Sequence, residues 1–176
     1  SDADYNYKDF LRFELEQSYD INEAKDDNPD KPFSPIEARL DFFPGKWVGL
    51  DADALFSVYD TKFLSHNIGG KFWDNRGDRL SVEYRYTRDS DEIEFNESKS
   101  ILLDLRVKVT DRLAMRGDYE YNFLDDTRVQ TGFGINYKAD CWSFDGSVID
   151  KINAKDTRDL KYEIKINLFG LGEFGI

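Results

Sequence analysis

The sequence has few of the residues that catalytic and disulfide-bonded proteins need. Cys141 is the only cysteine, so no disulfide can form within the chain. His66 is the only histidine and no G-x-S-x-G motif is present, so a Ser-His or Asp-His catalytic centre is not expected. No apolar run approaches the roughly 18 residues of a membrane-spanning helix. Crossing a membrane by helix is therefore excluded, whereas crossing by strands is not.

Positive charge is also scarce. The 176 residues contain 24 Lys and Arg against 36 Asp and Glu, which gives a formal net charge of -12. An acidic chain repels polyphosphate and no basic stripe offsets this repulsion, so nucleic acid is not expected as a partner. The mean hydropathy of -0.67 would by itself suggest a soluble domain. That average misleads if each strand has one polar and one apolar face.

Aromatic residues are abundant, with 14 Phe, 10 Tyr and 3 Trp. Disordered chains lack the apolar surface needed to offset chain entropy, so this chain is expected to fold. The chain begins at Ser1, without a basic start or an apolar signal segment, and Met115 is its sole methionine. We therefore expect either a processed mature chain or a piece of a larger one.

The dominant pattern is a period-two alternation of apolar and polar side chains. It is clearest over 160–168, where one face of a strand would carry Leu160, Tyr162, Ile164, Ile166 and Leu168. A short apolar tail, 169–176, follows directly. The pattern recurs along the chain and predicts strands at 9–20, 33–44, 47–60, 63–73, 78–88, 98–110, 113–123, 128–138, 142–150 and 160–168.

Strand length separates membrane barrels from most soluble sheets. A tilted transmembrane strand needs about 9 to 11 residues, against ~5 to 6 in soluble proteins. Each predicted segment is long enough to cross a bilayer. The segment 63–73 has the weakest pattern, because His66, Gly69 and Gly70 interrupt its apolar face.

The connections between the predicted strands differ in length. The short turns are at 44–46, 74–78, 111–112 and 138–141, and the long polar links are at 21–32, 89–97 and 151–159. The links near 61–62 and 124–127 are short as well. Short periplasmic turns and longer outer loops are typical of an outer-membrane barrel. The three tryptophans border short turns, as an aromatic girdle at one membrane interface requires, and they are Trp47, Trp73 and Trp142.

These patterns predict an all-β fold, an antiparallel up-and-down transmembrane β-barrel of about ten strands. Residues 1–176 are expected to form a single barrel segment with no second domain. A soluble antiparallel sandwich has alternating strands too and is the alternative. Charges of both signs on the predicted inner face suit a hydrated lumen, and they are Arg12, Glu14, Arg39, Asp51, Asp53, Arg85, Arg106, Lys108, Arg116, Asp118, Glu120, Lys161, Glu163 and Lys165.

No residue is assigned to catalysis or to metal binding. The lone histidine is more typical of a structural residue than of a catalytic one, and the acidic run 26–30 lacks the residue order of a calcium loop. We expect a protein that is not an enzyme and that binds no cofactor.

Several motifs also occur in a fixed order along the chain. They are DFLRF at 9–13, QSYD at 17–20, KPFS at 31–34, GDRLS at 77–81, EYRYT at 83–87, YKADCW at 137–142 and INLFGLG at 166–172. In order and spacing they resemble the C-terminal barrel region of the outer-membrane LPS-assembly protein LptD family, also called the organic solvent tolerance family. The likeness extends over nearly all of the chain.

The resemblance implies a translocon in the outer membrane of a Gram-negative bacterium that inserts lipopolysaccharide into the outer leaflet. This chain would be the last ten or so strands of a much larger barrel. The implied partners are lipopolysaccharide, outer-membrane lipid, an LptE-like plug lipoprotein, an LptA-like periplasmic bridge protein and the barrel assembly machinery. A self-contained small barrel that acts as an anchor, a binder or a narrow pore is the alternative.

The resemblance also implies roles for residues near the C-terminus. The segment 160–168 matches the family's last strand, which forms one side of a lateral gate for lipid. Phe174 is the candidate for the terminal aromatic residue that the assembly machinery recognises. Cys141 matches a disulfide position whose partner lies outside this chain, and a free thiol is the alternative.

Overall fold

The computed structural model describes residues 9–21, 31–90, 97–152, 157–169 and 172–175. All regular structure in these ranges is β-strand. No helix in this part of the chain is long and apolar enough to cross a membrane. Most of the predicted links 21–32 and 89–97 lies outside the described residues, whereas the predicted link 151–159 is shortened by the ends of β9 and β10 and only 153–156 of it lies outside.

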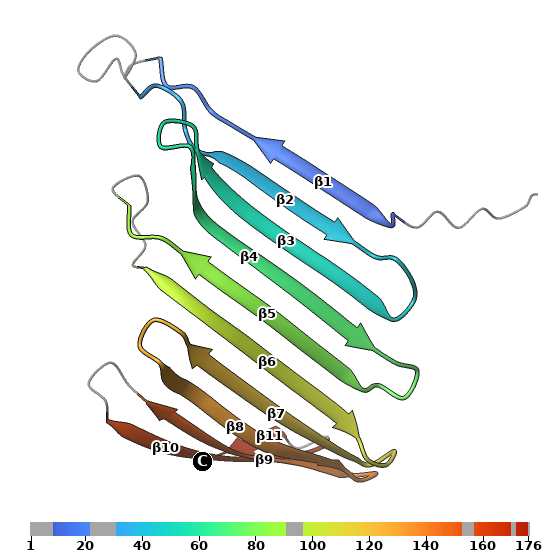
Figure 1. The fold of residues 1–176 in the computed structure, drawn as a ribbon. Coiled ribbons are helices and arrows are strands. Elements are labelled where there is room, and N and C mark those ends of the chain that lie inside the picture. Colours follow the sequence, from blue (N-terminus) through green and yellow to red (C-terminus); the bar gives the residue numbers. More distant parts are fainter. Residues whose placement is uncertain (1–8, 22–30, 91–96, 153–156, 170–171, 176) are drawn as a thin grey trace, which may run out of the picture. The chain divides into compact units, whose positions relative to one another are not determined.

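The strands follow one another in the sheet in the same order as in the sequence, so the topology is an up-and-down meander (Figure 1). This confirms the predicted all-β, antiparallel, up-and-down fold. The strands are β1 (Leu11–Glu16), β2 (Ile36–Phe42), β3 (Val48–Ser57), β4 (Lys62–Trp73), β5 (Arg79–Thr87), β6 (Ser98–Lys108), β7 (Leu113–Asn122), β8 (Thr127–Lys138), β9 (Trp142–Ile152), β10 (Arg158–Leu168) and β11 (Gly172–Gly175).

The strand order is open within the described residues. β1 stands at one end of the order and β11 at the other, and β1 pairs with β2 rather than with the last strands. A complete small barrel would pair its first and last strands. The open order is consistent with part of a larger barrel.

The chain divides into two compact units. The first contains Ser1–Gly70 and Arg85–Glu97, and the second contains Lys71–Tyr84 and Ser98–Ile176. The assignment of 1–176 to one barrel segment stays a prediction.

In the first unit, the pairing of β1, β2 and β3 sorts side chains onto two faces. Phe13 lies opposite Leu40, which lies opposite Ala52, so these apolar residues share one face. Glu14 lies opposite Arg39 on the other face. A shift by one residue would exchange the two faces, so the apolar pattern fixes this register.

Two strands of this unit are shorter than the sequence pattern predicted. β1 has 6 residues and β2 has 7, so the prediction that every segment reaches membrane-spanning length is wrong here. Proline explains the interruption, because Pro35 has no N–H to give to the ladder just before β2. Pairing resumes beyond it, where Tyr19 bridges Phe33.

In the second unit, β6 to β10 form a continuous antiparallel ladder. Leu103 lies opposite Tyr119 on the apolar face, and Arg106 lies opposite Arg116 on the polar face. The expected apolar tail is not a simple extension of the last strand. Its described part forms β11, which pairs with the end of β10 so that Phe174 lies opposite Ile166.

Glycines on the polar face make room for charged side chains of neighbouring strands. A Cβ added at Gly132 would lie 2.0 Å from Oδ1 of Asp118, and one at Gly69 would lie 2.3 Å from Oδ2 of Asp51. Gly69 therefore does not weaken β4, which at 12 residues equals the longest strand. The sequence pattern misjudged this segment because its glycine faces the polar side.

We predict that Gly132→Ala destabilises the sheet by about 1 kcal/mol, the low end of the cost of overpacking. The added methyl group displaces the Asp118 carboxylate, which accepts a hydrogen bond from Gln130 at 2.7 Å. Urea unfolding of the protein inserted in vesicles measures the effect. Gly45→Ala is the control because nothing lies within 4 Å of its added Cβ, and equal stability of the two variants would contradict the prediction.

Candidate functional site

The polar face of the second unit carries a basic cavity where the strands meet the short turns. The cavity has a volume of about 280 Å³. It is lined by the side chains of β5 to β8 and of the turn at 109–112, among which five are basic, namely Arg79, Arg106, Lys108, Arg112 and Lys138. We call these five residues the basic pocket. Asp111 is the single acidic residue in the lining.

Three of the basic side chains keep their charge uncompensated. Lys108 pairs with Asp111 at 2.7 Å, and Arg112 pairs with Asp140 at 3.1 Å. Arg79, Arg106 and Lys138 have no ion-pair partner in the described part of the chain. The basic pocket is therefore a local positive site in a chain with a net charge of -12. Planar guanidinium groups at such a site suit phosphate or carboxylate ligands.

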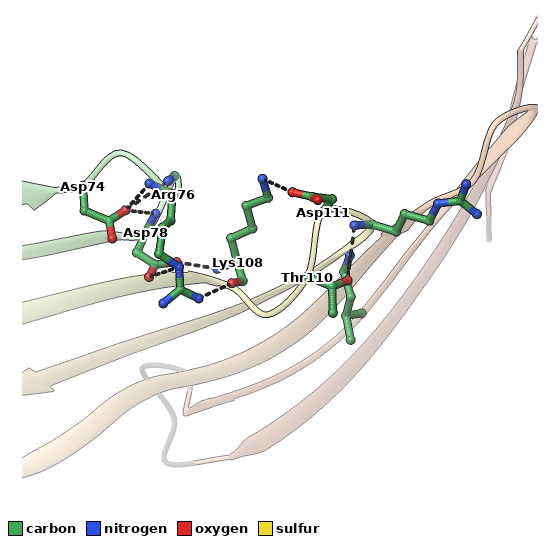
Figure 2. A network of polar contacts seen from close by, with 9 residues as sticks. Asp74, Arg76, Asp78, Lys108, Thr110 and Asp111 are labelled. Atoms are coloured by element: carbon green, nitrogen blue, oxygen red, sulfur yellow. Dashed lines mark hydrogen bonds and ion pairs between the residues drawn. The ribbon is translucent and has the colours of Figure 1, made fainter.

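A network of backbone contacts holds two short turns together at this rim (Figure 2). The Asp74 carboxylate accepts hydrogen bonds from the backbone N–H groups of Arg76, Gly77 and Asp78, at 2.9, 3.0 and 2.9 Å. These bonds close the turn between β4 and β5. Gly77 has φ +98, a conformation that side chains disfavour, which explains a glycine there.

The same network joins this turn to the end of β6. Arg76 donates to the carbonyl oxygen of Lys108 at 3.0 Å, and the backbone N–H of Lys108 donates to Asp78 at 2.6 Å. The Lys108 side chain turns the other way and hydrogen bonds to Asp111, which lowers the pKa of the Asp111 carboxyl below its usual value. Backbone and side chain of Lys108 are thus fixed separately, which positions one wall of the basic pocket.

The next turn is closed by a hydroxyl group. Oγ1 of Thr110 accepts hydrogen bonds from the backbone N–H groups of Arg112 and Leu113, at 3.2 and 3.0 Å (Figure 2). The Arg112 side chain then reaches Asp140 in the following turn. Three consecutive short turns are therefore linked along one edge of the second unit.

The charges predicted for the inner face in β1 to β3 and in β6 to β10 lie on the polar face within each unit. In the first unit, Arg39 lies between Glu14 and Asp53 in the register. In the second, Arg116 reaches Asp145 two strands away, with N–O distances of 2.7 and 3.2 Å.

Each predicted girdle tryptophan lies beside a short turn. Trp47 directly precedes β3, Trp73 ends β4 and Trp142 begins β9. Trp142 lies opposite Leu168 and packs against Tyr137, with ring centroids 5.5 Å apart. The aromatic girdle as a whole stays a prediction.

Cys141 is an exposed free cysteine in the turn between β8 and β9. Its carbonyl oxygen accepts a hydrogen bond from the backbone N–H of Phe169 at 3.0 Å, which ties this turn to the end of β10. No partner for its thiol is part of the chain, so its disulfide stays a prediction.

The predicted gate residues lie on the apolar face of β10. Alternate residues of this strand are exposed, and they are Leu160, Tyr162, Ile164 and Ile166. Leu168 is half-buried at the end of the strand, opposite Trp142. β11 pairs with Lys165–Leu168 only. The gate and assembly roles of these residues and of Phe174 stay predictions.

Sequence reasoning named Arg106 and Lys108 as inner charges but missed the basic pocket. Arg79, Arg112 and Lys138 border three different short turns, and only the strand register brings them together. The available signal was the repeated placement of basic residues beside short turns in an acidic chain.

Comparison with protein families identifies the chain. The family model LptD, described as LPS transport system D, matches residues 3–98, which is more than half of the 176 residues. The chain belongs to the LptD family. Comparison with curated proteins gives no match. The resemblance expected from the motifs is confirmed, although YKADCW and INLFGLG lie beyond the matched residues.

LptD is a family of outer-membrane proteins of Gram-negative bacteria that act in LPS transport and assembly. LPS is accordingly the substrate associated with the family. The antiparallel meander, with one apolar and one polar face, is the structure that such a barrel wall requires. The expectations of an outer-membrane protein, a β-barrel and a role in LPS transport are confirmed at this level.

We predict that Asp74→Ala destabilises the fold by about 1 to 3 kcal/mol, because three backbone N–H groups lose a charged acceptor. Urea unfolding of the vesicle-inserted protein measures this loss. Asp140→Ala is the matched control: among the described residues its exposed carboxylate binds only the Arg112 side chain, and an exposed pair is worth about 1 kcal/mol or less. If Asp140→Ala cost as much as Asp74→Ala, the turn network would not have the role given to it.

Proposed function

We propose that this chain is a non-enzymatic barrel segment that takes part in inserting LPS into the outer leaflet of the outer membrane. The observation that carries the proposal is the basic pocket on the polar face of a chain that belongs to an LPS transport family. In this proposal the pocket contacts the phosphorylated headgroup as LPS enters from the periplasmic side.

The two faces of the sheet match the two parts of the substrate. LPS joins acyl chains to a phosphorylated sugar headgroup. A transport path therefore has to keep the headgroup hydrated while the acyl chains contact the membrane. The polar face, with paired charges such as Arg116 and Asp145, supports a hydrated path for the headgroup. The apolar face, with residues such as Phe133 and Tyr162, suits contact with lipid.

A gate at β10 is part of the proposal. β11 pairs with Lys165–Leu168, and the strand order gives the rest of that edge no further described partner. An unpaired strand edge readily accepts another strand. We assign this edge to the seam with the first strand of the full-length barrel, which opens to release lipid sideways.

The remaining roles follow from the same orientation, with the short turns in the periplasm. The polar face would contact an LptE-like plug lipoprotein, and an LptA-like bridge protein would deliver LPS to the periplasmic part of the full-length protein. Phe174 would take part in recognition by the barrel assembly machinery. Cys141 would form a disulfide with a cysteine outside this chain, since the periplasm is oxidising and its thiol is exposed.

We predict that Arg79→Gln combined with Arg106→Gln lowers the amount of LPS that reaches the cell surface. Loss of two charged hydrogen-bond donors weakens a phosphate contact by about tenfold or more. Surface LPS is measured in cells that depend on the variant, at matched levels of folded barrel. Arg12→Gln is the control, because Arg12 already pairs with Glu14 on the polar face of the other unit. Normal export by the double variant would contradict the role of the basic pocket.

We predict that a disulfide between Ile164→Cys and a cysteine in the first strand of the full-length barrel blocks LPS export, because it holds the seam closed. Adding a reductant should restore export. The control is the cysteine pair Val148→Cys and Tyr162→Cys, which joins two strands that are already paired. Export that continued through the cross-linked seam would remove the gate from the proposal.

A further inference from the structure

An ionic cluster lies at the other end of the second unit, near the start of β8, the end of β9 and the start of β10. Asp150 accepts hydrogen bonds from Nη2 of Arg128 at 2.7 Å and from Nε and Nη2 of Arg158 at 2.9 and 2.8 Å. None of these three residues was expected to matter from the sequence. The cluster contains two cations and one anion, so it carries a net positive charge.

The register places Asp150 on the apolar face. Asp150 lies opposite Thr131 in β8 and Leu160 in β10, and Leu160 alternates with Tyr162 and Ile164 on that face. Its neighbour Ile149 lies on the polar face instead, opposite Lys161. The alternation is thus reversed at this point of β9, so that the charges face the side that carries the apolar residues.

The aspartate and the arginines differ sharply in exposure. The side chain of Asp150 is 12% exposed, whereas those of Arg128 and Arg158 are 38% and 69% exposed. The nearly buried Asp150 carboxylate therefore holds the two more exposed guanidinium groups in place. Each guanidinium has more N–H groups than these bonds use, and their planar geometry suits the oxygens of a phosphate group.

An apolar surface continues from the cluster toward the middle of the strands. The next row on the same face pairs Phe133 with Val148 and Val148 with Tyr162. Phe133 and Tyr162 are 53% and 63% exposed. A ligand bound here would have an anionic group at the arginines and an apolar part along this row, which describes a phospholipid or another phosphorylated lipid.

The position along the strands agrees with such a ligand. Charged residues on a lipid-facing surface are costly at the bilayer centre but cost only about 0 to 1 kcal/mol near the interface. Arg158 is the first residue of β10, and Arg128 is the second residue of β8. Both lie at the strand ends away from Trp142, where the proposed orientation places the headgroups of the outer leaflet.

We propose that Arg128 and Arg158, anchored by Asp150, bind the phosphate group of a membrane lipid whose acyl chains lie along Phe133, Val148 and Tyr162. The site is on the lipid-facing wall and is separate from the basic pocket, which lies on the other face and at the other strand ends. The assignment rests on the membrane orientation in the proposed function.

Lipid binding by the purified protein tests the site. The protein is inserted into phosphatidylcholine vesicles with and without phosphatidic acid, and native mass spectrometry identifies the lipids that stay bound. Arg128→Gln combined with Arg158→Gln should weaken retention of phosphatidic acid by about tenfold, the effect of losing contacts to a charged group. Arg12→Gln is the matched control, because Arg12 also pairs with a carboxylate, that of Glu14, but on the polar face of the other unit. Unchanged retention in the double variant would overturn the proposal.

Two further variants separate lipid binding from a purely structural ion cluster. Asp150→Asn removes the anion and leaves both guanidinium groups, so phosphatidic acid should still be retained. A loss equal to that of the double variant would mean that the cluster only stabilises the strands. Arg158→Gln alone keeps the pair between Arg128 and Asp150, so it should fold and still retain less phosphatidic acid by severalfold. Full retention by this variant would overturn the proposal.

Two controls separate the alternatives. One distinguishes a lipid site from a site for free phosphate, and the other distinguishes failure of the proposed function from failure of this inference. Excess inorganic phosphate should displace little phosphatidic acid, because the apolar row contributes to binding. Complete displacement would indicate a site for free phosphate and would overturn the lipid assignment. Failure of the wild-type protein to insert into vesicles would count against the proposed function, whereas insertion without preference for phosphatidic acid would overturn this inference alone.

Discussion

The separation of polar and apolar faces by strand register is the constraint on which the rest of this protein depends. Each cross-strand pair helps to fix the register, because a slip of one residue would turn the charges of a strand toward lipid. Glycines also restrict the register sterically. Gly132 and Gly134 lie opposite Asp118 and Arg116, whose side chains fill the space that a Cβ would need. A slipped strand would bring a side chain into that space.

The short-turn rim shows how this register builds a site that no single strand contains. The basic pocket takes one arginine from β5, an arginine and a lysine from β6, an arginine from the turn between β6 and β7, and a lysine from β8. The turns at this rim carry Asp74, Asp78 and Asp111, and of these three only Asp111 pairs with a side chain of the pocket. The first two bind backbone N–H groups, so they fix the chain without neutralising Arg79 or Arg106. The rim is therefore rigid and still positive.

Much of the fold could be predicted from the alternation alone, because period two reports directly which face is apolar. The segments 98–110 and 113–123 correspond closely to β6 and β7. The interruption before β2 depends on the missing N–H of Pro35, and β11 has only four residues, two of them glycine, which leaves no alternation to detect. The basic pocket and the cluster around Asp150 could not be predicted for a different reason. Both depend on which strands are neighbours, and Asp150 breaks the alternation from which the faces were assigned.

The basic pocket and the cluster around Asp150 are the two positive sites of the second unit, and their positions are related as well as their charges. The basic pocket lies on the polar face at the short turns, and the cluster around Asp150 lies on the apolar face at the opposite strand ends. A headgroup that met first one and then the other would have to change faces on the way. A hydrogen-bonded sheet cannot be crossed, so the passage has to go around an edge. Arg158 lies on β10 itself, whose edge is paired with β11 only over Lys165–Leu168, at the end of the strand away from Arg158. The second site thus lies on the strand that any lipid leaving by that edge would pass.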